Sequence, residues 1–215
     1  MNSLKINSLP VTTVHQLDEI SVLLDNLERH TLSHYLWKKL FVKPRVNFTI
    51  GYNATDLFVK FYVLEPYIRA VFRNPNEPVY QDSCVELFIS FGDDENYYNL
   101  EFNCMGTCLG QYGKNKADRK FIAVDLLNEI KAKTHITNAN QNELYEWELA
   151  LKIPFSVFNT KTRTLQFDSS VRVNFYKCGD ELEEPHFIAW NPIHSGEPNF
   201  HLPAFFGSAS FENKA

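Results

Sequence analysis

Alternating apolar and polar positions dominate the sequence from residue 44 onward. RVNFTIGY (Arg45–Tyr52) and DLFVKFYV (Asp56–Val63) both alternate, and a short turn that contains asparagine separates them. This pattern predicts the two strands of a hairpin. Further segments of the same kind are CVELFISF, NYYNLEFN, YEWELALKI, VRVNFYKCG, HFIAW and FGSASF. Many short strands joined by turns indicate an all-β fold, a β-sandwich or jelly roll.

One segment has a helical pattern instead. Apolar residues recur every three or four positions between Val14 and Arg29, with charged residues between them, which predicts one amphipathic helix. We therefore expect a single domain, with residues 1–43 as an N-terminal helical extension and residues 44–213 as the sandwich. The segment Phe121–Thr137 fits either a helix or a strand with a turn, and PFSVF after Pro154 predicts a short helical turn.

Composition and charge exclude some classes of partner. The 215 residues are 44% hydrophobic, which suits a globular protein, and the formal net charge is −5. The one short basic stretch, KNKADRK (Lys114–Lys120), is interpreted as a solvated turn, so we expect no nucleic-acid partner. No apolar run is long enough to span a membrane, and MNSLKINSLP is unlike a signal peptide. We expect no membrane partner and a cytoplasmic location.

The sequence gives little support for a metal or cofactor. Cysteines 84, 104, 108 and 178 lack zinc-ribbon spacing, and in such a chain reduced thiols are the default. His186, His194 and His201 are close in sequence, and a zinc site is the alternative to ordinary loop histidines. The acidic turn GDDEN (Gly92–Asn96) is interpreted as a polar hairpin, with a calcium site as the alternative. We expect no cofactor.

Two stretches resemble one known family. They are VYQDSCVELFI, followed by NYYNLEFNCMGTCLG, and the ending PHFIAWNPIHSGEPNFHLPAFFGSASF. Together they are similar to the family-nine carbohydrate-binding modules, which occur attached to xylanases and other enzymes of polysaccharide breakdown. The resemblance covers about Pro44 to Phe211. Its matching positions are Tyr80, Ser83 or Asp82, Val85, Glu86, Phe88, Trp190, Phe200, Pro203, Phe206 and Gly207.

The resemblance implies a β-sandwich that binds the end of a mono- or oligosaccharide without breaking a bond. Two aromatic rings would hold the terminal sugar, here Tyr80 and Phe200, and Glu86 would accept hydrogen bonds from hydroxyls. A sugar ring offers an apolar face and a rim of hydroxyls, which suits aromatic walls with a few fixed acceptors. Further candidates for this site are Glu101, Asn103, Arg172 and Trp190.

Each of these residues also has a structural interpretation. Tyr80 and Phe200 can be ordinary aromatic residues near loop ends, and Glu86 can be an internal acceptor, because a buried carboxylate must be paired. Trp190 is more often a core residue. The family usually has tryptophan where this sequence has Tyr80 and Phe200, and a basic residue where it has Glu101.

Two alternative functions stay open at the sequence level. One is a relative of the fold that has lost sugar binding and serves as an interaction domain. The other is a glycoside hydrolase whose acid and base come from Glu86, Glu101 or Glu148. That mechanism needs two carboxyl groups about 5–5.5 Å or about 6.5–9.5 Å apart across an open cleft.

Overall fold

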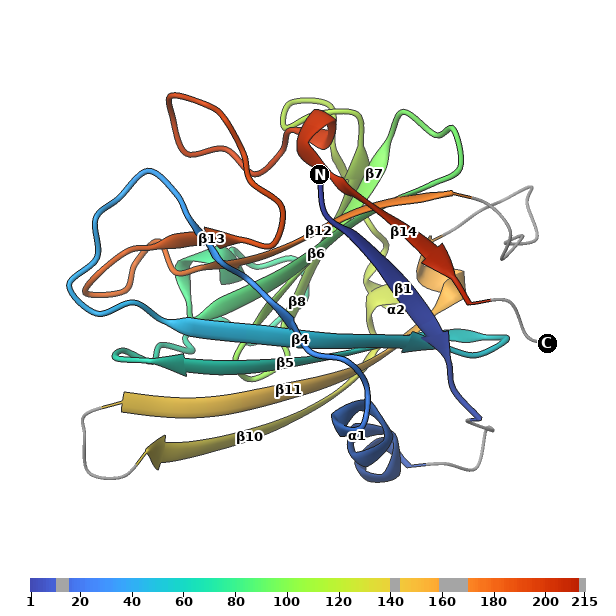
Figure 1. The fold of residues 1–215 in the computed structure, drawn as a ribbon, viewed down its shortest axis with the longest axis horizontal. Helices are drawn as coiled ribbons and strands as arrows, with labels where there is room; N and C mark the ends of the chain where they lie inside the picture. Colours follow the sequence, from blue (N-terminus) through green and yellow to red (C-terminus); the bar gives the residue numbers. More distant parts are fainter. Residues whose placement is uncertain (11–15, 140–143, 159–169, 213–215) are drawn as a thin grey trace.

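The fold is a β-sandwich, and the computed structural model describes residues 1–10, 16–139, 144–158 and 170–212. Two curled sheets lie face to face, and the N-terminal strand β1 (Ser3–Ser8) crosses between them (Figure 1). The predicted all-β sandwich is confirmed.

The first sheet carries most of the residues that matter below. Its strands lie in the order β9-β8-β7-β6-β12-β14-β1, and β13 and β3 extend it beside β12. Its neighbouring strands are antiparallel except β1 and β14, which run parallel. The bounds are β3 (His34–Tyr35), β6 (Cys84–Phe91), β7 (Tyr97–Asn103), β8 (Cys108–Gly113), β9 (Lys120–Phe121), β12 (Val171–Cys178), β13 (Phe187–Ala189) and β14 (Gly207–Phe211).

The second sheet has the order β10-β11-β5-β4, with β2 beside β4. β1 joins the two sheets, because Ser3–Ile6 pair with β14 and Asn7–Ser8 pair with β4. The expectation that residues 1–43 form a helical extension is therefore corrected, since this segment also supplies β1, β2 and β3. The bounds are β2 (His30–Thr31), β4 (Arg45–Tyr52), β5 (Asp56–Glu65), β10 (Lys131–Ala139) and β11 (Leu144–Pro154).

The helices are short, and α1 covers the outer face of the second sheet. The predicted helix appears as α1 (Leu17–Asp25), which packs Ile20 and Leu24 against Phe58 of β5; the N-terminal end of the prediction, at Val14, lies outside the described residues. The ambiguous segment from residue 121 becomes the end of β9, then α2 (Val124–Leu127) and β10. The predicted turn after Pro154 is confirmed as a 3-10 helix, η2 (Phe155–Phe158); the others are η1 (Val79–Gln81) and η3 (Pro203–Phe205).

Strand β6 is buried on both faces, and this explains its composition. Val85, Leu87 and Ile89 point into the main core between the sheets, and each is fully buried. Phe88 points to the opposite face of the first sheet, as strand alternation requires, and is also fully buried because loops cover that face. Rings from these loops, including Trp37 and Phe200, form a second apolar cluster there.

A buried ion pair connects the two sheets. Lys177 Nζ of β12 lies 2.8 Å from Glu65 Oε2 at the end of β5, and neither side chain is exposed. Trp147 Nε1 of β11 donates to Glu65 Oε1 at 2.7 Å. His186 Nε2 lies 2.9 Å from Lys177 Nζ, and burial lowers the pKa of His186 to about 2, so the neutral imidazole accepts from the ammonium.

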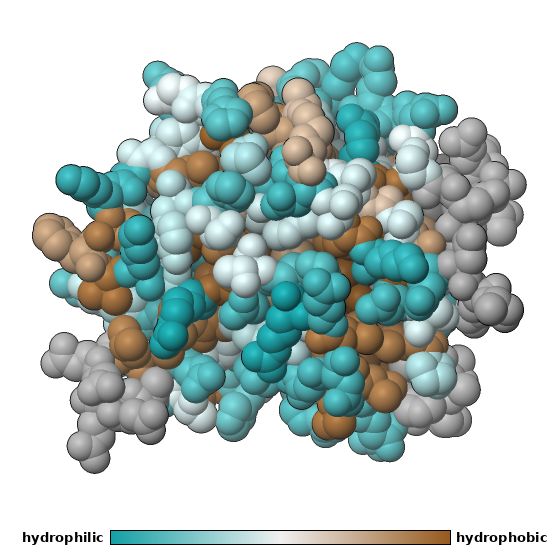
Figure 2. Space-filling view, viewed as in Figure 1, coloured by the Kyte–Doolittle hydropathy of each residue, from teal (hydrophilic) through white to brown (hydrophobic). Residues whose placement is uncertain are grey.

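The side of the molecule seen in Figure 2 is neither uniformly hydrophobic nor uniformly hydrophilic. Hydrophobic residues are scattered among hydrophilic ones over this face (Figure 2), which is usual for a folded domain. Of the helices in the described ranges, none combines the length and the apolar character that crossing a membrane would need.

Candidate functional site

A cavity of about 450 Å³ opens on the outer face of the first sheet, the face turned away from the second sheet. This volume lies within the range of about 300–1,000 Å³ that is typical of small-molecule sites. Glu86, Glu101 and Leu109, from β6, β7 and β8, supply its floor. Its walls come from loops that the strand ends hold in place, among them those that carry Trp37 and Asp180.

The two floor glutamates are direct neighbours. Glu86 of β6 and Glu101 of β7 are cross-strand partners, and they are 2% and 3% exposed. The Cys178 thiol donates to Glu86 Oε1 at 3.0 Å, and Asn99 Nδ2 donates to Glu101 Oε1 at 2.9 Å. Burial raises the pKa of both carboxyls, that of Glu101 to about 7, and the charge of Glu101 raises the pKa of Glu86 further.

Two cations face these carboxyls from the turn between β8 and β9. Arg119 Nη1 lies 3.9 Å from Glu101 Oε1, and its side chain is 10% exposed. Lys116 also lines the cavity. The interpretation of KNKADRK as a solvated turn was therefore wrong for Arg119, whereas Lys116 is exposed. The pairing of Gln111 with Phe121 and of Tyr112 with Lys120 brings this turn over the cavity. The sequence of the turn contains no motif that predicts this position.

The aromatic residues of the cavity differ in how much of each ring is free. Tyr80, on η1, is 37% exposed and lines the cavity. Phe200 also lines it but is only 8% exposed, because it packs on Tyr176, Trp37 and Phe187. Sequence reasoning assigned Trp37 no role, although this ring lines the cavity.

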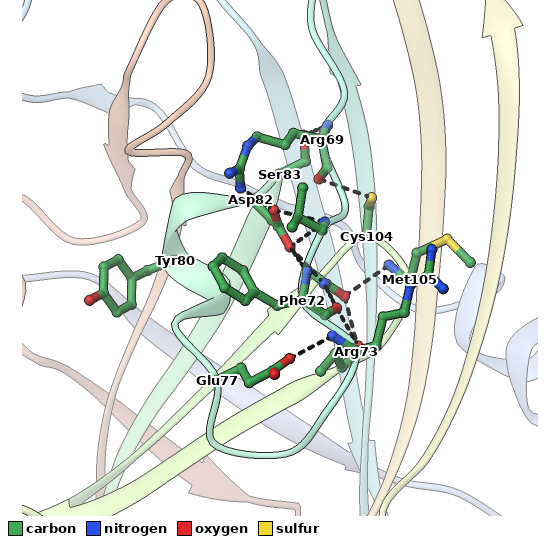
Figure 3. A network of polar contacts seen from close by, with 12 residues as sticks. Arg69, Phe72, Arg73, Glu77, Tyr80, Asp82, Ser83, Cys104 and Met105 are labelled. Atoms are coloured by element: carbon green, nitrogen blue, oxygen red, sulfur yellow. Dashed lines mark hydrogen bonds and ion pairs between the residues drawn. The ribbon is translucent and has the colours of Figure 1, made fainter.

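The turn that carries Tyr80 is anchored by the buried carboxylate of Asp82 (Figure 3). Asp82 accepts hydrogen bonds from the backbone N–H groups of Val71 and Phe72, and from Asn103 Nδ2 at 3.0 Å. Arg69 completes the network as an ion pair with Asp82. Figure 3 shows Tyr80 pointing away from these contacts, so the network fixes the base of η1 and leaves the ring free.

Three of the predicted site residues are not among those that line the cavity. Asn103 lies on the same face as Glu101, but its amide binds Asp82 and the Phe72 carbonyl. Arg172 lies at the opposite end of β12 from Cys178 and donates to Ser90 Oγ and the Asp94 carbonyl. Trp190 packs edge-on against Phe48 and Phe175 in the main core. Their contacts are structural, whereas Tyr80, Glu86, Glu101 and Phe200 meet at the cavity.

The candidate metal ligands do not assemble as the alternatives required. Within the described ranges, one group of three residues brings ligand atoms within 4.8 Å of one another, and it is Cys84, Glu86 and Cys178. Burial raises the pKa of both thiols, which keeps them protonated. His186 and His201 are not part of it. Asp94, in the acidic turn, accepts hydrogen bonds from Tyr112 and Asn96.

The hydrolase alternative loses one of its three carboxyls. Glu148 lies on β11 of the second sheet, where its Oε2 is 2.8 Å from Lys60 Nζ. Glu86 and Glu101 remain, but they lie side by side on one floor instead of facing each other across a cleft.

Comparison with known proteins gives a consistent family. The profile of Carbohydrate-binding family 9 matches residues 16–211. A candidate carbohydrate-binding protein from Bacteroides uniformis ATCC 8492 is 35% identical and superposes with a TM-score of 0.88, covering 98% of this chain and 99% of its own. None of the curated proteins compared matches the chain significantly.

Two more distant structures share the fold. A family 9 carbohydrate-binding module from Caldicellulosiruptor kristjanssonii in complex with glucose has a TM-score of 0.65 at 12% identity, covering 100% of this chain and 97% of that one. The same organism's module in complex with cellotriose has a TM-score of 0.61 at 13% identity, with coverage of 100% and 95%. With the profile match over most of its length, the chain belongs to Carbohydrate-binding family 9.

Proposed function

We propose that this protein binds the end of a mono- or oligosaccharide in the cavity over the first sheet, without cleaving it. The observation that carries this proposal is the meeting of Tyr80, Phe200, Glu86 and Glu101 around one cavity, although they come from three separate parts of the chain. The family supports the same function, since structures of a family 9 module from Caldicellulosiruptor kristjanssonii are known in complex with glucose and with cellotriose.

The chemistry of the lining suits a sugar. The Tyr80 ring offers a partly exposed apolar face, and the floor carboxyls offer acceptors for hydroxyl groups. Arg119 and Gln111 add donors beside these acceptors. The alternative of a scaffold without a site would leave Tyr80 and Phe200 in the core with no cavity between them, and this is not the arrangement observed.

Titration calorimetry tests the proposal directly. We expect heat on binding from at least one of glucose, xylose, galactose, cellobiose and xylobiose, and at least a tenfold loss of affinity in Glu86→Gln. The matched control is Glu148→Gln, which changes the same side chain on the second sheet and should leave the affinity unchanged. A folded protein that binds none of these sugars would overturn the proposal. So would sustained release of reducing sugar that stops in Glu86→Gln, because it would show an enzyme.

A further inference from the structure

The cavity holds more acidic than basic side chains. Glu86, Glu101 and Asp180 line it together with only two cationic side chains of the described chain, Lys116 and Arg119. From this arrangement we propose that the preferred ligand is an amino sugar, whose protonated amine lies against the Glu86–Glu101 pair. This inference rests on the proposed function and specifies the class of sugar.

The other ionisable groups near the pair do not change this balance. Burial raises the pKa of the nearby thiols and phenols, so they are neutral near pH 7, and it lowers the pKa of His201 to about 2, so this imidazole carries no charge. The neutral groups are Tyr80, Cys84, Tyr97, Cys108, Tyr176 and Cys178. The charge of the cavity is therefore set by three carboxyls and two cations, and burial raises the pKa of all three carboxyls.

Each floor glutamate keeps one oxygen for a ligand. The bonds described above involve Oε1 of Glu86 and Oε1 of Glu101. In the described part of the chain, neither Oε2 atom has a hydrogen-bond partner. Neither is among the fully enclosed side-chain oxygens of these ranges that lack a hydrogen bond, which are Asn99 Oδ1 and Glu65 Oε2, the latter held by its ion pair with Lys177. Both Oε2 atoms therefore keep some exposure, and both residues line the cavity on neighbouring strands.

An ammonium group satisfies this floor better than a hydroxyl does. Two like charges opposite each other on neighbouring strands repel, and a buried charge without a partner is costly. A hydroxyl donates one hydrogen bond and leaves the repulsion in place. An ammonium donates up to three, each charge-assisted, and removes the repulsion. Burial raises the pKa of Glu101 to about 7, so near neutral pH a proton competes for the place that a cation would fill.

The two cations favour this placement over an acidic sugar. Arg119 Nη1 lies 3.9 Å from Glu101 Oε1, so this carboxyl already offsets part of the charge of Arg119. A uronic acid would have to bring a further carboxylate beside three others. Tighter binding of a uronic acid is the opposite outcome, and in that case Lys116 would contact the carboxylate of the sugar.

Calorimetry with four related sugars decides the question: glucosamine, glucose, N-acetylglucosamine and glucuronate at pH 6.5. We expect glucosamine to bind at least tenfold more tightly than glucose, and N-acetylglucosamine to show no such gain, because acetylation removes the charge. Glu101→Gln should reduce the preference for glucosamine to less than threefold. The matched control is Glu148→Gln, which should keep it.

A second readout does not depend on a variant. Repeating the wild-type titrations in two buffers with different ionisation enthalpies measures protons released on binding, and we expect release with glucosamine but not with glucose. Equal or tighter binding of glucose, tighter binding of glucuronate, or no proton release with glucosamine would overturn the inference while the proposed function stands. If none of the sugars in either panel binds, the proposed function itself fails.

Discussion

The ring of Phe200 stacks on the ring of Tyr176, with the centroids 4.2 Å apart and the planes 11° from parallel. One face of Phe200 is therefore occupied by the protein, and Phe187 packs against it edge-on. Tyr80 is much more exposed. The two rings predicted to hold a sugar are unequal, and this decides what each substitution will do.

Phe200→Ala should destabilise the fold as well as the site. Removing a buried phenyl ring leaves a cavity, and we expect a loss of about 3 kcal/mol in the free energy of unfolding. Urea denaturation followed by tryptophan fluorescence measures this. Phe200→Leu, which retains most of the apolar volume, should lose less. Unchanged stability in Phe200→Ala would mean that its contacts with Tyr176 contribute little.

Tyr80→Ala should affect sugar binding with little effect on stability. The ring is partly exposed, and the Asp82 network holds η1 without it. We expect about a tenfold loss of affinity, or about 1.4 kcal/mol, as for a lost aromatic contact. Calorimetry measures it, with Tyr80→Phe expected to retain binding. Phe41→Ala, at an almost fully exposed ring that does not line the cavity, is the control. Equal affinities of Tyr80→Ala and wild type would remove Tyr80 from the site.

The free energy of unfolding should depend on pH through Glu101. Burial raises the pKa of its carboxyl from an ordinary value of 4.5 to about 7. Between these values the folded protein retains a proton that the unfolded chain releases, so this group's contribution to stability is full below pH 4.5 and is lost as the pH rises to about 7. Glu101→Gln cannot lose this contribution. The free energy of unfolding of the variant, relative to that of the wild type, should therefore rise from pH 4.5 to about pH 7.

The measurement is therefore a difference between two proteins. Denaturation of both at several pH values should give a slope of at most about 1.4 kcal/mol per pH unit for one group. His186 and His201, with pKa values of about 2, change stability in the opposite direction below their ordinary value of 6.5, and they do so in both proteins. A difference that stays constant from pH 4.5 to 7 would contradict the raised pKa of Glu101.

The buried pair of Lys177 and Glu65 should show strong coupling. Lys177→Met leaves the Glu65 carboxylate enclosed without its charge partner, which typically costs about 3–5 kcal/mol. Adding Glu65→Gln removes that charge and should restore part of the loss, while Trp147 Nε1 can still donate to the amide oxygen. Denaturation of the wild type, both single variants and the double variant measures the coupling. Strictly additive losses would show that the pair does not act as a unit.

The longer strands could be predicted from the sequence because their apolar positions alternate over many residues and one face of each strand packs on the core. Arg45–Tyr52 pack one face on the core, so the pattern of apolar positions records burial directly. β1 was missed because Leu4 and Ile6 alone make its alternation, and its partners lie far away along the chain. Short parallel strands of this kind carry almost no local signal.

Half of the candidate site could be predicted for a similar reason. Glu86 and Glu101 interrupt apolar strands, which marks them as special in any single sequence. Nothing in the turn that holds Arg119 tells which strand it folds back on, so its place beside Glu101 requires the pairing of β8 with β9. Arg172 was predicted as a site residue but does not line the cavity. It lies on the same face of β12 as Cys178, but at the other end of the strand.

The position of β1 between β4 and β14 has a consequence for how the protein folds. Ser3–Ile6 pair with Ser208–Phe211, so this part of the sheet forms only when two segments far apart in the sequence meet. Until then the edge of β12 that β14 will cover stays open. Closing a loop of nearly the whole chain is slow. The pairing of β1 with β14 should therefore be among the last contacts to form when the protein refolds.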